Sequence, residues 1–148
     1  MSPEEISTLR ARLGASQDDM AALLGISTDA LALCELGQLA PAGTVATRLF
    51  WLADAAYCME QVIALRAFLN KTESATVAAG LKAFLAALPF VRLPMTGLTL
   101  ASILRSPIGG LLTEISVARI SAAEKDSAAQ TGEQADHCSS GLEVNHAG

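Results

Sequence analysis

Apolar residues recur every three or four positions through most of the chain, a spacing that places them on one face of an α-helix. Before residue 40 this pattern is interrupted by serines that can cap the start of a helix and by glycines that can end one. The pattern therefore predicts three short helices, each bounded by one serine and one glycine. The bounding pairs are Ser2 and Gly14, Ser16 and Gly25, and Ser27 and Gly37.

A longer helix is predicted from Thr44 to about Asn70, and two apolar stripes run along it. Together the two stripes cover more of the helix surface than one packing partner would hide. We expect the first stripe to close the N-terminal module, and the second to pack either on the C-terminal half of a monomer or on another subunit. The dimerisation residues assigned to the second stripe are Trp51, Cys58, Val62, Leu65 and Leu69.

The pattern after residue 70 predicts further helices and then a polar tail. A helix from Ser74 to Leu88 ends at Pro89, and short helices follow at about 98–105 and 111–123. The rest of the chain is rich in Ser, Gly, Gln and acidic residues, so we expect it to be disordered. The predicted fold class is all-α. Its regions are 1–54, an N-terminal module; 55–123, an apolar helical region that dimerises; and 124–148, a disordered acidic tail.

The composition raises the question of a membrane, because 51% of the residues are hydrophobic and the mean hydropathy is +0.40. No uncharged apolar run, however, approaches the roughly 18–20 residues that a spanning helix needs. The start of the chain carries Pro3, Glu4 and Glu5 in place of the basic and apolar segments of a signal peptide, so we expect a cytoplasmic protein without membrane contact. The basic residues that interrupt the apolar region are Lys71, Lys82, Arg92, Arg105 and Arg119.

Residues of the types that carry catalysis or bind metals are sparse. Cys34, Cys58 and Cys138 are widely spaced, so neither a disulfide framework nor a zinc site is predicted. The two histidines lie in the predicted tail, and no Gly-rich phosphate loop or Ser-His-Asp arrangement can be placed on a predicted element. We therefore expect neither an enzyme nor a bound cofactor or metal. A small-ligand pocket between the apolar C-terminal helices stays open as an alternative to a plain core.

The segment from Ser16 to Ser27 reads SQDDMAALLGIS, and CELG follows at residues 34–37. This motif resembles the Cro/lambda-repressor-like (Xre) helix-turn-helix family. The matching features are Ser-Gln at the start of the first helix, Ala21 where the two helices cross, the Leu-Gly-Ile-Ser turn, and the Glu-x-Gly that closes the second helix. The resemblance covers about residues 3–54 and implies a module of five short helices within them.

The resemblance also implies that the second helix of the pair, which begins at Ser27, enters the major groove of DNA. Gln17 would lie beside a phosphate and the adjacent base edge. Thr28 could offer its methyl group to thymine or its hydroxyl to any base, and Asp29 could accept a hydrogen bond from cytosine. The residues assigned to DNA binding are Gln17, Ser27, Thr28, Asp29, Leu33 and Gln38.

Charge is unevenly distributed along the chain. Residues 1–54 carry three basic and seven acidic groups, a net charge of −4. Residues 55–120 carry six basic and three acidic groups, a net charge of +3, and residues 121–148 carry one basic and five acidic groups, a net charge of −4. An acidic module gains little from the release of counterions, which supplies most non-specific affinity for DNA.

Two functions therefore stay open. The first is a sequence-specific DNA-binding transcription regulator that acts as a homodimer on an inverted repeat, with half-sites about one helical turn, roughly 34 Å, apart. In that case the second subunit and the basic central region would add phosphate contacts. The second is a helix-turn-helix that serves as a packing scaffold and binds a partner protein, for instance as an antirepressor, an antitoxin or an accessory subunit of a transcription complex.

Overall fold

The computed structural model describes the backbone of residues 1–138 and the side chains of residues 1–132. This part of the chain contains seven α-helices and no β-strand, so the predicted all-α fold class is confirmed. None of the described helices is long and apolar enough to cross a membrane. The helices are α1 (Pro3–Leu13), α2 (Gln17–Leu24), α3 (Thr28–Glu35), α4 (Gly43–Lys71), α5 (Ala75–Ala87), α6 (Leu100–Leu104) and α7 (Gly109–Cys138), with a 3-10 turn at Leu88–Phe90.

Helices α1, α2 and α3 begin at the predicted serines. Ser2, Ser16 and Ser27 each accept a hydrogen bond from a backbone N–H in the first turn of the helix that follows. Gly14 and Gly25 end α1 and α2 in the left-handed conformation, with φ values of 67° and 72°, which glycine adopts without steric cost. The three predicted short helices are therefore confirmed.

Residues 3–54 form three short helices and the first part of α4, rather than five short helices. Helix α4 is 29 residues long and runs through the boundary predicted between residues 54 and 55. No proline and no further glycine follows Gly43 within it, so nothing in the sequence interrupts its ladder of hydrogen bonds. The N-terminal module and the C-terminal half therefore share this helix.

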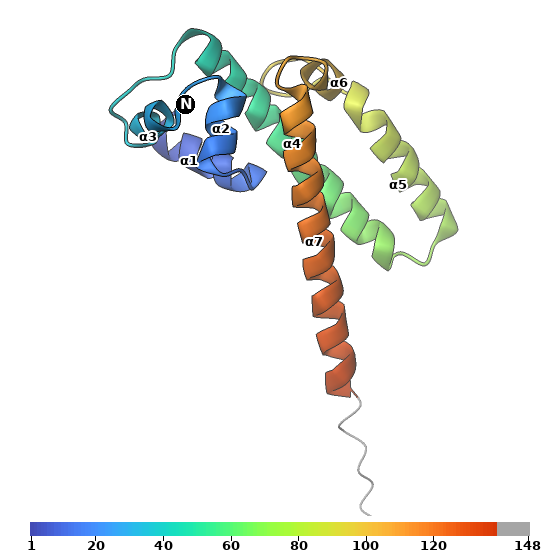
Figure 1. The fold of residues 1–148 in the computed structure, drawn as a ribbon. Coiled ribbons are helices and arrows are strands. Elements are labelled where there is room, and N and C mark those ends of the chain that lie inside the picture. Colours follow the sequence, from blue (N-terminus) through green and yellow to red (C-terminus); the bar gives the residue numbers. More distant parts are fainter. Residues whose placement is uncertain (139–148) are drawn as a thin grey trace, which may run out of the picture.

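The seven helices are arranged along α4 (Figure 1). Helices α1, α2 and α3 gather around its N-terminal half, whereas α5 folds back along its C-terminal half. Helix α7 crosses α4, packs against α4 and α6, and also contacts α1 and α2. The two long helices thus connect the N-terminal module with the rest of the chain.

Helix α7 corrects the prediction of a disordered tail from residue 124. The helix continues to Cys138, although few of its later residues are apolar. Ala, Glu and Gln are frequent there, and these residues favour a helix without burial. Arg66 of α4 also holds this part of α7, because its Nη1 donates to Glu124 Oε1 at 2.8 Å. Residues 139–148 of the predicted tail lie outside the described residues.

One hydrophobic core joins both halves of the protein. Buried residues of the core come from α1, α2, α3, α4, α6 and α7, whereas α5 contributes none. Several of the largest core side chains are almost completely inaccessible to solvent, so the core is closed around the N-terminal half of α4. They are Ile6, Leu13, Met20, Leu23, Leu31, Leu49, Leu52, Ile103 and Leu112.

Among the residues whose side chains are described, Asp54 is the one charged residue that is buried, and none of its surface is exposed. Its Oδ1 accepts a hydrogen bond from the Met95 N–H at 3.1 Å. Its Oδ2 accepts from the Thr96 N–H at 2.9 Å and from the Thr96 hydroxyl at 2.6 Å. Three donors thus compensate the carboxylate for its loss of water, and they fasten the loop before α6 to the middle of α4.

Candidate DNA-binding surface

Helices α2 and α3 form the predicted pair, joined by a turn at residues 25–27. At the C-terminal end of α2, Arg48 Nη1 of α4 donates to the Leu23 carbonyl oxygen at 3.3 Å. At the N-terminal end, Thr28 Oγ1 of α3 donates to Asp18 Oδ1 at 2.8 Å. Contacts at both ends of α2 therefore fix its orientation relative to α3 and α4.

The six residues assigned to DNA binding come from α2, α3 and the segments that flank α3. Thr28 is half-buried beside Asp18. The Ser27 hydroxyl oxygen is used as the cap of α3, where it accepts from a backbone N–H at 3.2 Å. The exposed members of the set are Gln17, Ser27, Asp29, Leu33 and Gln38. Their exposure suits a binding surface, and their contact with DNA stays a prediction.

A polar network that sequence analysis missed lies behind Gln17. Gln17 Nε2 donates to Glu35 Oε2 at 3.1 Å, and Arg10 Nε donates to Glu35 Oε1 at 2.7 Å. The Glu35 side chain is only 10% exposed. The hydrogen bond from Arg10 lowers the pKa of Glu35, burial opposes this effect, and the hydrogen bond from Gln17 lowers the pKa further. The net effect is a lowered pKa, so the Glu35 carboxylate stays charged. Because it accepts hydrogen bonds from Arg10 of α1 and Gln17 of α2, it joins these two helices to α3.

The sequence held only a partial signal for this network. Glu35 belongs to the Glu-x-Gly that closes the helix pair, so the motif marked its position. Its partner Arg10 lies 25 residues earlier in the chain, on a different helix. No helical spacing relates two residues that far apart, so only the packing of α1 on α3 reveals the ion pair.

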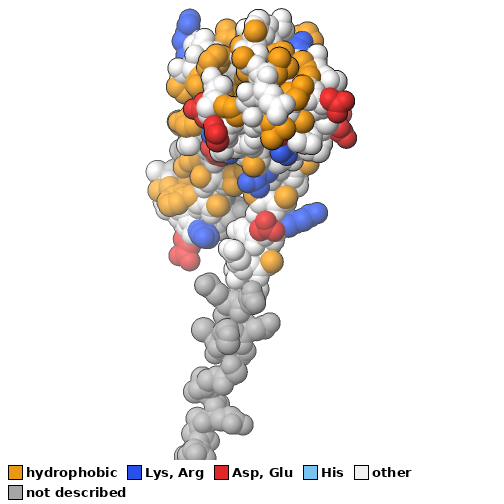
Figure 2. Space-filling view, turned by 90° about the vertical axis from the view of Figure 1, so that its left-hand side faces the viewer, with side chains coloured by type: hydrophobic (Ala, Val, Ile, Leu, Met, Phe, Trp, Pro, Cys, Tyr) orange, Lys and Arg blue, Asp and Glu red, His pale blue; other side chains and the backbone are white. Residues whose placement is uncertain are grey.

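The surface of α2 and α3 lacks positive charge, because neither helix contains a basic residue. Asp18 and Asp29 are exposed on it. The nearest arginines are engaged elsewhere, since Arg10 pairs with Glu35 and Arg48 donates to a backbone carbonyl oxygen. Figure 2, which views the molecule from the side of these helices, shows mostly hydrophobic and uncharged side chains, with acidic groups at the edges and basic groups at the upper margin and below. Any ligand of this surface must be bound without a cluster of free cations.

Exposed leucines continue this surface beyond α3. Leu33 is 41% exposed, Leu36 is 69% exposed and Leu39 is 45% exposed. Leu33 and Leu39 are adjacent in space, because the Leu39 N–H donates to the Leu33 carbonyl oxygen at 3.1 Å. A contiguous group of large apolar side chains on a surface is typical of a contact site for a base edge or for another protein.

The predicted dimerisation stripe of α4 is partly covered within the monomer. Cys58 is 1% exposed, so its assignment to a subunit interface is wrong. Cys58 is buried because α6 and α7 pack over the face of α4 that contains Cys58 and Val62. Trp51 packs against the core as a half-buried residue, and Val62, Leu65 and Leu69 are half-buried as well.

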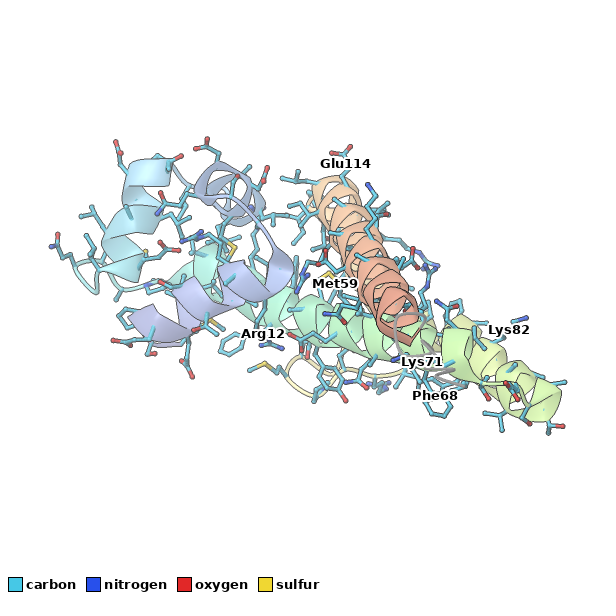
Figure 3. The ribbon with its side chains drawn as sticks, turned by 90° about the horizontal axis from the view of Figure 1, so that it is seen from below. Arg12, Met59, Phe68, Lys71, Lys82 and Glu114 are labelled. Carbon is cyan, nitrogen blue, oxygen red and sulfur yellow. The ribbon has the colours of Figure 1, made fainter. Side chains whose placement is uncertain are left out.

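Apolar side chains are also exposed in residues 64–87, which we call the α4–α5 arm. No residue of the arm is buried. Phe68 is 56% exposed, Val77 is 43% exposed and Phe84 is 51% exposed. Figure 3 shows Phe68, Lys71 and Lys82 on the part of the molecule that extends away from α1, α2 and α3. This segment belongs to the predicted dimerisation region, but its two exposed phenylalanines are not among the residues assigned to dimerisation.

Comparison of the chain with protein-family models, with curated proteins and with solved structures finds no match. The resemblance to the Xre family therefore stays a prediction that rests on the motif between Ser16 and Gly37. Among the described residues, no group of three or more His, Cys, Asp or Glu side chains is arranged to hold a metal ion. The candidate site is thus defined by the geometry of α2 and α3 and by the residues exposed on them.

Proposed function

We propose that the protein is a sequence-specific DNA-binding transcription regulator that acts as a homodimer. The observation that carries this proposal is the α2–α3 pair, in which both ends of α2 are fixed and five of the six residues assigned to DNA binding are exposed, Thr28 being half-buried. A short helix presented in this way can enter the major groove, while the helix before it crosses the DNA backbone. Rigid presentation matters because base readout depends on hydrogen-bond geometry.

Gln17 has a defined role in this proposal. Its side-chain amide has two N–H donors, and Glu35 accepts from one of them at 3.1 Å. The second donor is available to a phosphate oxygen, in an orientation set by Glu35, which Arg10 holds in turn. Gln17 would therefore contact the DNA backbone, and Glu35 would be a positioning residue behind it.

The charge of the surface determines what kind of DNA binding we propose. Because α2 and α3 contain no basic residue, few phosphates are neutralised and the affinity of one module is low. The salt dependence should also be shallow, since its slope follows the number of phosphates contacted. Useful affinity then requires two modules on one DNA molecule, which is the reason for proposing a dimer.

The α4–α5 arm is the surface that we propose for this dimer. Phe68, Val77 and Phe84 expose apolar area there, and Lys82 is the only charged residue in α5. A two-fold axis would bring the same patch of both subunits together and would present two α3 helices related by that axis. The preferred DNA is then an inverted repeat.

A second function, binding of a partner protein through the same face of α3, is favoured by one observation. Leu33, Leu36 and Leu39 are exposed beside the acidic groups of Asp18 and Asp29. An apolar centre with an acidic rim is complementary to a partner surface that is apolar and basic, and it opposes the phosphate backbone. Under this function the helix pair is a scaffold that presents leucines.

Selection from a random-sequence DNA library, at low and at moderate salt, tests the proposed function. The DNA-binding function predicts enrichment of an inverted repeat that persists at moderate salt. Gln17→Ala and Thr28→Ala should weaken binding or relax the preferred sequence. The matched controls are Gln130→Ala and Thr8→Ala, which remove the same side chains from exposed positions on α7 and α1.

Absence of enrichment at both salt concentrations would contradict DNA binding and favour the partner-binding function. A substitution of one exposed leucine then distinguishes DNA binding from binding of a partner protein. Leu36→Lys adds a positive charge at the most exposed leucine, so it should strengthen contact with DNA but weaken contact with a basic, apolar protein surface.

A further inference from the structure

Helices α4, α6 and α7 line a half-open cavity of about 130 Å³ that neither proposed function uses. Its floor is formed by core residues, since Leu112 is completely buried and Cys58 and Met59 are 1% and 4% exposed. Its mouth is open to solvent, because Leu104 is 36% exposed and Val117 is 58% exposed. The complete lining is Ala55, Cys58, Met59, Val62, Leu100, Leu104, Leu112, Thr113, Ser116, Val117 and Ile120.

The lining is almost entirely apolar and contains no charged side chain. Of its two hydroxyl groups, that of Thr113 donates to the Gly109 carbonyl oxygen at 2.7 Å. The Ser116 hydroxyl is therefore the lining group that can donate a hydrogen bond to an occupant. A water molecule needs two to four polar partners to be held well, so water is a poor occupant of this space.

We propose that this cavity binds a small neutral apolar molecule, of the size of one six-membered ring or a short alkyl chain, with at most one hydrogen-bond acceptor. The size follows from the volume, because an apolar cavity of about 150 Å³ in a helical protein holds benzene. Neutrality follows from the lining, because a charged ligand would lose its hydration without gaining an ionic partner. The Ser116 hydroxyl sets the single polar contact.

The dimensions of the cavity favour a small molecule over a segment of another protein. Its volume is close to that of one large side chain, so a helix of a second subunit would not fit between α4, α6 and α7. A bound molecule would contact all three helices at once. Because α4 and α7 also pack on the N-terminal module, such a ligand would stabilise the packing of the two halves.

Titration of the full-length protein with benzene, followed by ligand-observed NMR and by thermal unfolding, tests the proposal. We expect saturable binding with a dissociation constant on the order of 1 mM, a typical value for so small a ligand. At about ten times that concentration the melting temperature should rise by roughly 3–6 °C. Benzoate, which has the same ring but a negative charge, should neither bind nor stabilise.

Filling the cavity supplies the matched control. Ser116→Leu places additional carbon atoms inside the cavity, whereas Ser121→Leu makes the same change at an exposed position on α7. Benzene binding should be lost in Ser116→Leu and kept in Ser121→Leu. If Ser116→Leu does not fold, Val62→Phe fills the cavity from α4 and serves the same purpose.

The proposal is overturned if benzene does not bind saturably, or if the folded cavity-filled variants bind it as well as the wild type does. Equal stabilisation by benzoate would also overturn it, because the site would then not select neutral ligands. If benzene converts a dimer to a monomer in light scattering, the cavity is part of a subunit interface and the small-molecule proposal fails. None of these outcomes depends on whether the protein binds DNA.

Discussion

Leu13, Leu23 and Leu31 of the N-terminal module are fully buried, whereas no residue of the α4–α5 arm is buried at all. Yet the arm contains the strongly apolar helix α5, in which Lys82 is the only charged residue among 13. The module gathers three helices around one half of α4, whereas α5 packs against the other half of α4 and the adjacent 3-10 turn. Apolar content therefore does not locate a core, because burial requires partners on several sides of a helix.

The contrast also separates the proposed roles of the two regions. The module buries its apolar side chains in the common core and exposes a mixed surface on α2 and α3. The arm leaves apolar area in contact with water, which is unfavourable in proportion to that area until a partner covers it. The following predictions test this difference, beginning with the largest expected change in the free energy of unfolding.

Deletion of an apolar side chain should affect the two regions unequally. We expect Leu23→Ala in α2 to lower the free energy of unfolding by about 2–5 kcal/mol, as is usual for a fully buried leucine. Phe84→Ala in α5 removes a larger side chain, but one that is 51% exposed, so the loss should stay below about 1 kcal/mol. Urea unfolding at a concentration where the protein is monomeric gives both values. Equal losses would show that the arm is packed as tightly as the module.

The attachment of the C-terminal half should depend strongly on Asp54. Asp54→Ala leaves the Met95 and Thr96 N–H groups without their acceptor, so we expect a loss of roughly 3 kcal/mol. Asp54→Asn keeps one of the two acceptor oxygens and should lose less. Urea unfolding measures both losses, with Glu114→Ala as the control at an exposed carboxylate. A loss for Asp54→Ala as small as that of the control would refute the anchoring role.

The two arginine–carboxylate pairs of α1 should differ in strength because they differ in burial. Glu35 is 10% exposed in its pair with Arg10, whereas Glu60 is 41% exposed in its pair with Arg12. We expect Glu35→Gln to cost about 1–2 kcal/mol near neutral pH, and Glu60→Gln to cost less than about 1 kcal/mol because solvent screens that pair. Thermal unfolding of both variants measures the difference. The reverse order would show that exposure does not control these pairs.

The pH dependence of the Glu35 variant gives a further test of the same pair. The pKa of Glu35 is lower in the folded protein than its ordinary value of 4.5, chiefly because of the hydrogen bond from Arg10. The pair therefore stabilises the fold fully above the ordinary value, and this stability is lost as the pH falls through the lowered pKa. The stability of the wild type should approach that of Glu35→Gln in acid. A difference that persists unchanged in acid would contradict the ionic nature of the contact.

Asp29→Arg should change stability least and DNA binding most visibly. Asp29 is exposed in the first turn of α3, where an acidic residue is worth about 0.5 kcal/mol to the helix, so only that much stability is at stake. Non-specific DNA affinity should rise, and the slope of log K against log salt should steepen by about one unit, because one additional phosphate is neutralised. Fluorescence anisotropy at several salt concentrations measures the slope. Asp126→Arg on α7 makes the same charge change away from the surface, and an equal effect there would contradict the docking of α3.

Features of the fold that depend on neighbouring residues were predictable from the sequence. A serine cap and a terminal glycine act within one turn, so Ser2, Ser16 and Gly25 marked helix boundaries correctly. The resemblance also directed attention to α2 and α3, and the residues assigned there are largely exposed. Low apolar content predicts disorder for residues 124–138, but this segment is helical, because it contains strong helix formers.

Features that depend on which helices meet were not predictable. Cys58 lies on an apolar stripe for which the sequence leaves two partners open, the C-terminal half or a second subunit, and in the structure α6 and α7 cover Cys58 within the monomer. Asp54 is buried by contacts with Met95 and Thr96, which lie 41 and 42 residues later in the chain, and no sequence pattern relates residues so far apart. Periodicity indicates which face of a helix is apolar, but it does not identify the partner that covers that face.

The central claim is that the module contacts DNA while the arm assembles the dimer, and one titration tests it most directly. The selected inverted-repeat duplex is titrated with wild type and with the Phe84→Lys variant, and fluorescence anisotropy gives affinity and stoichiometry. The account predicts two wild-type protomers on each duplex, and a variant with an intact helical circular dichroism spectrum that binds at least about tenfold more weakly, because avidity is lost. Binding of the variant with unchanged affinity and stoichiometry would contradict the account.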